Sequence, residues 1–245
     1  MRTVIVTGGT SGIGLAIAEK FLRENASVIV ASRDSDKVVE KAMSELKACG
    51  DAMYQYLELC SKKSCAKLLE NVINKYKKVD VLVNAAGVRG KADPPFETDY
   101  EDLERTMQIN FTGTIRMATM TAEYMKRQGE GTIINISSIS GSMVTAPDYG
   151  YHCSKCALDM ATKILAKEVS PYGVRCLTVA PGGVKAGMNS SEWERTGKKL
   201  HIRNRLLTAG EVAGAVYLLS TKEASAVNGT VLMLDDGYTA YKGIY

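Results

Sequence analysis

The chain has 245 residues, of which 45% are hydrophobic and 24% charged, a balance typical of one α/β domain with a substantial core. Its formal net charge is +4 and its lysines and arginines are scattered, so neither nucleic acid nor an anionic membrane is expected as a partner. The apolar run after Met1 is too short for a signal peptide or a membrane span, which predicts a cytoplasmic protein.

The six cysteines are expected to be free thiols, because a chain with room for a core needs no disulfide framework. Cys153 and Cys156 have the C-x-x-C spacing of a redox pair, but the surrounding motif favours two small residues on a helix face. Two histidines and dispersed cysteines lack ligand spacing, so no metal site is expected.

Short β-branched segments alternate with longer amphipathic segments along the chain. The predicted strands are residues 3–7, 27–31, 53–58, 79–84, 132–137, 174–180 and 230–234. Between the first two, Ile13, Ile17 and Phe21 recur every fourth residue, which places them on one helix face. This alternation predicts a Rossmann-type, doubly wound parallel sheet of about seven strands with helices on both faces, in a single domain spanning residues 1–245.

Residues 181–207 interrupt this alternation. They lack a clear strand pattern and contain Gly182, Gly183, Gly187 and Gly197. A long irregular segment after the carboxyl end of a strand is typical of a loop that covers a bound substrate. We therefore expect 181–207 to be a substrate-covering lid within the domain.

The first predicted strand runs into Thr7-Gly8-Gly9-Thr10-Ser11-Gly12-Ile13-Gly14, and a helix follows. Glycines at positions 8, 12 and 14 let the backbone approach a pyrophosphate, and the helix N-terminus offers unpaired N–H groups. No Gly-Lys-Ser/Thr follows, which excludes a Walker-type loop. Cofactor contacts are expected from Gly8, Thr10, Ser11, Gly12, Ile13 and Gly14.

This T-G-x-x-x-G-x-G spacing resembles that of the short-chain dehydrogenase/reductase family, and further family motifs follow in order. They are Asn84-Ala85-Ala86-Gly87, Asn110, Ser138, Tyr151-x-x-x-Lys155 and Pro181-Gly182-Gly183-Val184. The resemblance extends from Thr3 to Thr239. It implies an NAD(P)-dependent oxidoreductase that interconverts a ketone and a secondary alcohol by hydride transfer.

Tyr151 and Lys155 are four residues apart, so on a helix they share one face, and a neighbouring ammonium lowers the pKa of a phenol. The resemblance implies that Tyr151 is the catalytic acid/base, and that Lys155 tunes it and binds the nicotinamide ribose. It implies further that Ser138 holds the substrate oxygen and that Asn110 holds a water for proton relay. It also assigns cofactor contacts to Asn84, Ala85, Gly87, Pro181, Gly182 and Val184. Ala186 stands where the family often has a threonine that contacts the nicotinamide.

Ser32, Arg33 and Asp34 follow the second predicted strand and bear on the choice of cofactor. An acid in place of Ser32 would accept from the ribose 2′-hydroxyl of NAD, whereas a hydroxyl and a guanidinium suit a 2′-phosphate. The pattern therefore favours NADP(H), with the alternative that Asp34 takes the acidic role one residue late. Glu58 and Leu59 stand where relatives have Asp and an apolar residue near the adenine.

The substrate class stays open among hydroxysteroids, sugars or polyols, and 3-ketoacyl-type compounds. Within 181–207, Met188, Trp193 and Leu200 would suit a hydrophobic ketone. Four cations of that segment would instead suit an acidic substrate: Lys198, Lys199, Arg203 and Arg205.

Two other functions compete with an NADP-dependent reductase. One is an NAD-dependent alcohol dehydrogenase of the same family. The other is a non-catalytic nucleotide-sensing protein, which should have lost a catalytic residue, and none is missing. Family members usually form dimers or tetramers through the helices near Asn110 and Tyr151, so the resemblance implies a homotetramer that acts on a small molecule.

Overall fold

The structure is a computed structural model that describes residues 1–186 and 195–241. Seven runs of mostly aliphatic residues form one parallel sheet in the order β3-β2-β1-β4-β5-β6-β9. The strands are β1 (Thr3–Thr7), β2 (Ser27–Ser32), β3 (Ala52–Tyr56), β4 (Val81–Asn84), β5 (Gly131–Ile136), β6 (Val174–Pro181) and β9 (Val231–Leu234). The predicted seven-stranded, doubly wound sheet is confirmed, and the strand boundaries differ from the prediction by one to two residues at most ends.

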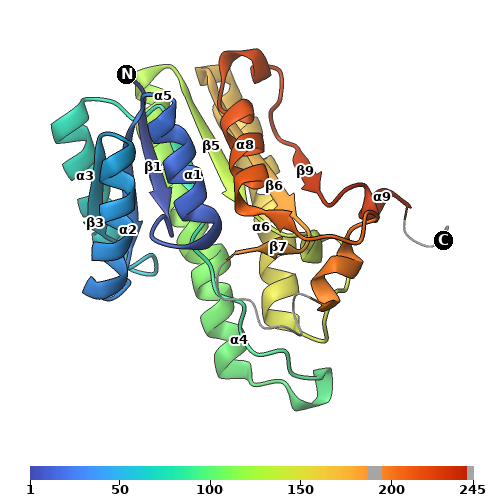
Figure 1. Ribbon diagram of the computed structural model, residues 1–245. Helices are drawn as coiled ribbons and strands as arrows, with labels where there is room; N and C mark the ends of the chain where they lie inside the picture. The colour runs from blue at the N-terminus through green and yellow to red at the C-terminus, as the bar shows by residue number, and fades with distance from the viewer. Residues whose placement is uncertain (187–194, 242–245) are drawn as a thin grey trace.

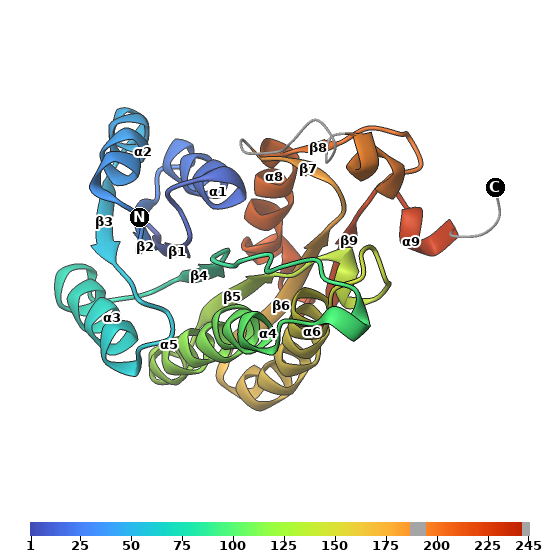
Figure 2. The same ribbon diagram turned by 90° about the horizontal axis from the view of Figure 1, so that it is seen from below.

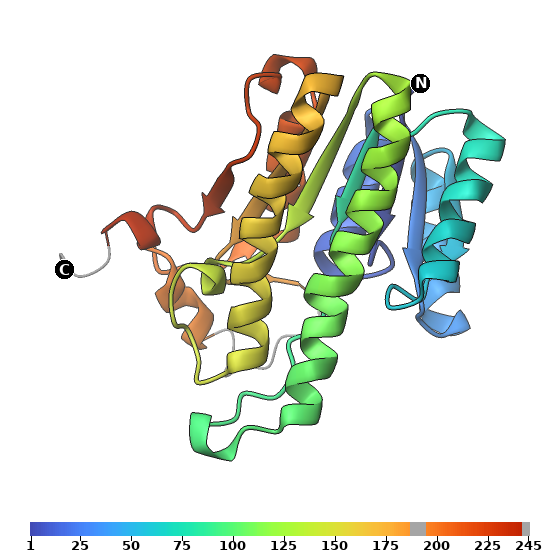
Figure 3. The ribbon, with the colours of Figure 1, turned by 180° about the vertical axis from the view of Figure 1, so that it is seen from behind.

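Helices cover both faces of this sheet, as Figures 1 and 3 show from opposite sides. One face carries α1 (Gly12–Arg23), α2 (Asp36–Cys49) and α8 (Ala209–Leu219). The other carries α3 (Lys62–Tyr76), α5 (Thr114–Gln128) and α6 (Tyr149–Val169). Two apolar clusters result, because alternate residues of the buried strands point to opposite faces: Val4 and Val6 pack under α1, and Ile5 packs under α3 and α5.

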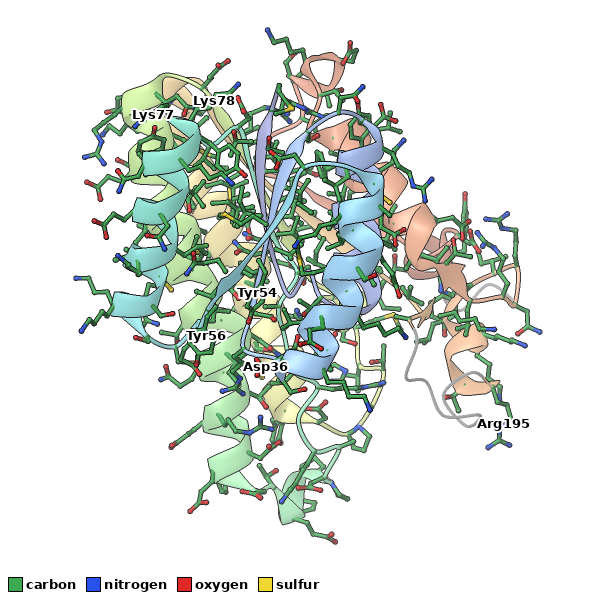
Figure 4. The ribbon with its side chains drawn as sticks, turned by 60° about the vertical axis from the view of Figure 1, so that its left-hand side comes forward. Asp36, Tyr54, Tyr56, Lys77, Lys78 and Arg195 are labelled. Atoms are coloured by element: carbon green, nitrogen blue, oxygen red, sulfur yellow. The ribbon has the colours of Figure 1, made fainter. Side chains whose placement is uncertain are left out.

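The helix that begins as α4 (Tyr100–Met107) passes through a π-helical turn, Gln108–Gly113, and continues as α5. Its α4 end extends past the carboxyl ends of the strands, at the bottom of Figure 1. Asp36 and Tyr56 also lie at that end of the molecule in Figure 4, whereas Lys77 and Lys78 lie at the opposite end. Figure 2 looks onto the carboxyl ends, where β1 lies between β2 and β4 and the order of the strands reverses. Doubly wound sheets bind their ligands at this reversal.

The segment 181–207 contains more regular structure than its sequence predicts. Val184–Lys185 (β7) pairs in parallel with Leu207–Thr208 (β8), and Val184 and Leu207 are buried. Strands of two residues are too short to show a period of two, which is why the sequence conceals them. Met188 and Trp193, the apolar residues expected to suit a hydrophobic ketone, lie outside the described residues.

Ionic contacts tie the end of this segment to the body of the domain. Arg205 forms two hydrogen bonds with the carboxylate of Glu211, at 2.8 and 2.9 Å, and a third with Asp236 at 3.2 Å. Arg203 also pairs with Asp236. Two of the four cations expected to attract an acidic substrate therefore already have carboxylate partners within the protein.

All six cysteines are free thiols, and Cys153 and Cys156 lie exposed on α6. Within the described ranges, no three ligand-type side chains come close enough together to hold a metal ion. No helix in the same ranges combines the length and the apolar character that crossing a bilayer requires.

Candidate active site

The turn between β1 and α1 requires glycine at two positions for reasons of space. Gly8 has a φ of +68°, and a Cβ there would lie 2.8 Å from the backbone of Ala86 at the end of β4. A Cβ on Gly14 would lie 2.1 Å from the carbonyl oxygen of Gly8. These glycines let the turn fold tightly between β1 and β4 and bring the N-terminus of α1 to the sheet.

No side chain caps the N-terminus of α1, and its first turn contains no acid. Ser11 is the N-cap residue, yet its hydroxyl accepts no backbone N–H of the helix. The unpaired N–H groups and the positive end of the helix dipole therefore face an adjoining cavity of about 440 Å³. A pyrophosphate fits such an end, so the site suits a dinucleotide.

Most of the residues predicted to bind the cofactor line this nucleotide cavity. They are Gly8, Ser11, Gly12, Ile13, Gly14, Ser32, Arg33, Glu58, Leu59, Ala85 and Gly87. Asp34, the alternative acidic residue, and Ala186, which replaces the family's threonine, also line the cavity. Five other lining residues were not predicted from the sequence: Ala31, Leu57, Ala86, Val88 and Ile109. Most of these are apolar residues beside a motif, and nothing in their own type distinguishes them from core residues.

Several of the predicted cofactor residues do not line the nucleotide cavity. Thr10 is buried and donates its hydroxyl to Asp34, and Asn84 is buried and donates to Asn135 at 2.8 Å. Pro181 and Val184 lie in strands outside its lining. Asn84 therefore joins β4 to β5 beneath the site.

Charged groups at the far end of the nucleotide cavity are already paired with one another. Arg33 Nη1 lies 3.1 Å from Glu58 Oε2, although about half of the arginine side chain is exposed. Glu58 Oε1 accepts the N–H of Cys60 at 3.2 Å. Asp34 accepts from Thr10 and thus has a partner on the phosphate-binding turn.

A second cavity of about 260 Å³ contains Ser138, Tyr151 and Lys155 in its lining, and we call it the catalytic cavity. Ile13, Ala85, Gly87 and Val88 line both cavities, so the two adjoin. Ser138 lies two residues after the end of β5, and the other two side chains come from the first two turns of α6. The fold thus gathers residues from distant parts of the chain at one end of the sheet.

Burial is the main influence on the phenol of Tyr151. It raises the pKa of Tyr151 above its ordinary value, while a hydrogen bond with Ser138 and the charge of Arg89 lower it. From the sequence, the ammonium of Lys155 was expected to lower this pKa. In the structure Lys155 Nζ lies 5.6 Å from the centre of the tyrosine ring and donates to the carbonyl oxygen of Ile136 at 2.9 Å. A phenol whose pKa is raised in this way is neutral and can donate a proton.

Lys155 is itself buried, with 5% of its surface exposed. Burial lowers the pKa of Lys155 to about 8, and the carboxylate of Asp159 opposes that effect. Asp159 lies one turn further along α6, and burial raises its pKa to about 6. A Cβ on Gly141 would lie 2.7 Å from Asp159 Oδ2, so the turn after Ser138 packs directly against this carboxylate.

Asn110 lies in the π-helical turn and is buried. Its amide forms two hydrogen bonds with the backbone of Val88, both at 2.8 Å, and a third with Ser154 Oγ at 3.1 Å. A Cβ on Gly87 would lie 3.2 Å from Asn110 Oδ1 and 3.7 Å from Lys155 Nζ. Asn110 therefore holds the end of β4 close to Lys155.

His152 fixes the loop before α6 and does not line either cavity. The N–H of Thr145 donates to His152 Nε2 at 2.9 Å, so Nδ1 carries the proton and donates to the carbonyl oxygen of Asp148 at 2.7 Å. Thr145 does line the catalytic cavity. The histidine thus positions a wall of that cavity.

A family model described as short chain dehydrogenase matches residues 2–197. Glucose 1-dehydrogenase 2 of Bacillus subtilis (strain 168) is 29% identical over 246 residues, covering 98% of this chain and 95% of that protein. 3beta-hydroxysteroid dehydrogenase 1 of Eggerthella lenta is 29% identical over 251 residues, covering 99% of this chain and 95% of that protein.

Among solved structures, a crystal structure of a variant of actinorhodin polyketide ketoreductase with NADPH is similar over 98% of both chains. Its TM-score is 0.92, at 28% sequence identity. The similarity therefore extends over the whole fold, including the end of the sheet where the two cavities meet.

Proposed function

The chain belongs to the short-chain dehydrogenase/reductase family, and on that premise we propose that it reduces a ketone to a secondary alcohol with NADP(H). One observation carries the proposal. Ser138, Tyr151 and Lys155 line a cavity that adjoins one suited to a dinucleotide. A non-catalytic nucleotide sensor would have no need of a neutral phenol hydrogen-bonded to a serine in that cavity.

When bound, the nicotinamide supplies the hydride that the carbonyl carbon accepts. Tyr151 transfers its phenolic proton to the carbonyl oxygen, and Ser138 donates a hydrogen bond to the charge that develops there. Lys155 holds a positive charge close to the phenolate that results, and it binds the ribose of the cofactor. Asn110 keeps the end of β4 beside Lys155 and holds the water that returns a proton. In alcohol oxidation Tyr151 acts as the base.

We expect Tyr151→Phe to abolish this proton transfer while leaving the fold intact. The loss of NADPH absorbance with a panel of ketones should slow by about 10²–10⁴-fold, the usual contribution of a general acid. NADPH binding, followed by its fluorescence, should persist because the nucleotide cavity is unchanged. Wild-type turnover in Tyr151→Phe would show that the mechanism is wrong.

Arg33 supports the preference for NADP(H). Its guanidinium lines the nucleotide cavity, about half exposed, and Glu58 contacts Nη1, which leaves other N–H groups to bind a 2′-phosphate. Asp34 has a partner in Thr10, which argues against its accepting from a ribose hydroxyl. A competing feature is Glu58, which neutralises Arg33 and would favour NAD(H) if the pair stayed closed.

The cofactor preference is measured as the ratio of kcat/KM with NADPH to that with NADH. Arg33→Ala should lower this ratio about tenfold or more, because a charge-assisted contact to the phosphate is lost. Lys37→Ala removes a nearby exposed cation outside the cavity and should leave the ratio unchanged. A ratio that survives Arg33→Ala would remove Arg33 from this role.

The relatives act on different carbonyl and alcohol classes by name, a sugar, a steroid and a polyketide among them. The segment 181–207 contributes Gly182 and Leu200 to the catalytic cavity. We assign it the role of a lid that closes over the substrate.

We propose further that the protein works as a homotetramer in the cytoplasm. Apolar side chains lie exposed on two separate surfaces, Met160 and Ile164 on α6, and Leu218 and Leu232 on α8 and β9. Two different surfaces of this kind suit two kinds of subunit contact, as a tetramer with three twofold axes needs.

A further inference from the structure

Arg89 is a second cation in the lining of the catalytic cavity. It follows Gly87 and Val88 after the end of β4, and it lines the catalytic cavity but not the nucleotide cavity. Its charge lowers the pKa of the Tyr151 phenol, which places the guanidinium within electrostatic reach of the reacting group. Arg89 therefore lies on the substrate side of the site.

The charge of this lining is positive. Its ionisable residues, in the described part of the chain, are Arg89, Tyr151 and Lys155, with no carboxylate among them. The acid that raises the pKa of Tyr151 is Asp148, whose side chain is only 3% exposed and accepts the N–H of Tyr151 at 2.8 Å. That carboxylate caps α6 and does not line the cavity.

The cations of the 181–207 segment differ in their partners and in their distance in sequence from the cavity lining. Arg203 and Arg205 are paired with carboxylates, and Arg195 points away from the body of the molecule (Figure 4). Lys198 and Lys199 are exposed and precede Leu200, which lines the catalytic cavity.

We propose that Arg89 binds a carboxylate of the substrate, so that the enzyme acts on keto acids and the corresponding hydroxy acids. This inference rests on the proposed function and names its substrate class. A guanidinium offers two parallel N–H donors that match the two oxygens of a carboxylate. One guanidinium balances one carboxylate, whereas a phosphate dianion would need further donors.

The size of the cavity agrees with a compact substrate. At about 260 Å³ it lies just below the ~300–1,000 Å³ range typical of ligand clefts. Apolar side chains, among them Val88, Ile139 and Leu200, line the space around the reacting groups. A short acyl chain between the ketone and the carboxylate fills such a space.

The test compares 3-, 4- and 5-oxo carboxylic acids, each with its own primary amide, as paired substrates. The wild-type enzyme should have a higher kcat/KM for at least one acid than for its amide, and Arg89→Gln should lower that ratio about 10–100-fold. Arg89→Lys should retain part of the preference. The neutral amide reports any effect of Arg89 on Tyr151 itself, so the ratio isolates the contact with the carboxylate.

Lys91→Gln is the matched control, because Lys91 belongs to the same loop, pairs with Asp99 at 2.5 Å and lies outside the catalytic cavity. It should leave every ratio unchanged. A ratio that Arg89→Gln does not change would overturn the inference, as would amides or the matching phosphate-bearing ketones being the preferred substrates, while the proposed function would stand.

Equilibrium binding of the same acids to the protein–NADP⁺ complex, measured by calorimetry, gives a readout that does not need turnover. We expect binding to the wild-type complex and its loss in Arg89→Gln. If no carbonyl compound is reduced at all, the proposed function fails, and this binding difference still decides the role of Arg89. Equal binding in the two proteins contradicts the inference.

Discussion

Asp159 is the residue whose chemistry depends most on its surroundings. Its residue surface is only 7% exposed, and its Oδ1 has no hydrogen-bond partner among the residues that the structure describes. A hydrogen bond with Ser137 and the charges of Lys155 and Lys163 act on it, and burial outweighs them. The charged groups that act on this carboxylate are thus two lysines, and both belong to α6. Asp159 partly offsets the cost of burying a positive Lys155.

We predict that Asp159→Asn shifts the pH dependence of ketone reduction. Burial already lowers the pKa of Lys155 to about 8, and without the neighbouring negative charge it falls further. Lys155 then loses its proton at a lower pH, so the alkaline limb of kcat/KM should move towards lower pH, by about one unit. The profile is measured from roughly pH 5 to 10 with saturating cofactor.

Glu168→Gln is the control, because Glu168 is an exposed acid on the same helix. Glu168→Gln should leave the alkaline limb of the kcat/KM profile at the wild-type pH. An unmoved limb in Asp159→Asn would mean that Lys155 does not sense this carboxylate, and a uniform loss of activity at every pH would indicate a structural role alone.

At the scale of elements, α6 presents one buried and one exposed apolar face. The exposed stripe consists of Tyr149, Cys153, Cys156, Met160 and Ile164. Its spacings of three and four residues place these side chains on one side of the helix. The C-x-x-C pair is thus part of this stripe. An exposed apolar stripe on a long helix favours packing against a second copy.

We predict that Ile164→Lys disrupts the assembly. A charge in the middle of an apolar contact costs desolvation energy without a partner, so the tetramer should dissociate to smaller species. Light scattering after size exclusion should give four times the chain mass of 26.5 kDa for the wild-type protein and less for the variant. Val38→Lys places the same charge on a half-exposed position of α2 and should keep the wild-type mass. A monomeric wild-type protein would contradict the prediction.

Local pattern predicted most elements and missed a few for a physical reason. Buried parallel strands appear as continuous aliphatic runs, and β1 and β4 stand out for that reason. The π-helical turn at Gln108–Gly113 has no such signal, because its register depends on packing against α6 and the end of β4. β7 and β8 were missed because each has two residues and their pairing joins distant positions.

On the scale of the whole molecule, the sheet brings together four segments that lie far apart in the chain. The turns after β1, β4, β5 and β6 meet at the carboxyl edge, and they contribute Gly12, Gly87, Ser138 and Gly182 to the adjoining cavities. Because parallel strands end at the same edge of the sheet, motifs that follow different strands come together in one site.

The sequence by itself determined the features that short spacings encode. The close approach of Gly14 to the carbonyl oxygen of Gly8, and Tyr151 one helical turn before Lys155, depend only on backbone geometry within a few residues. Only the tertiary structure decided which charged groups pair with one another, which are buried and which line a cavity. Arg205 meets Asp236 across 31 positions, Asp159 is buried by packing, and Arg89 faces the catalytic cavity. The reason is that burial and ion pairing are set by the groups that folding brings near, and the local pattern contains no record of them.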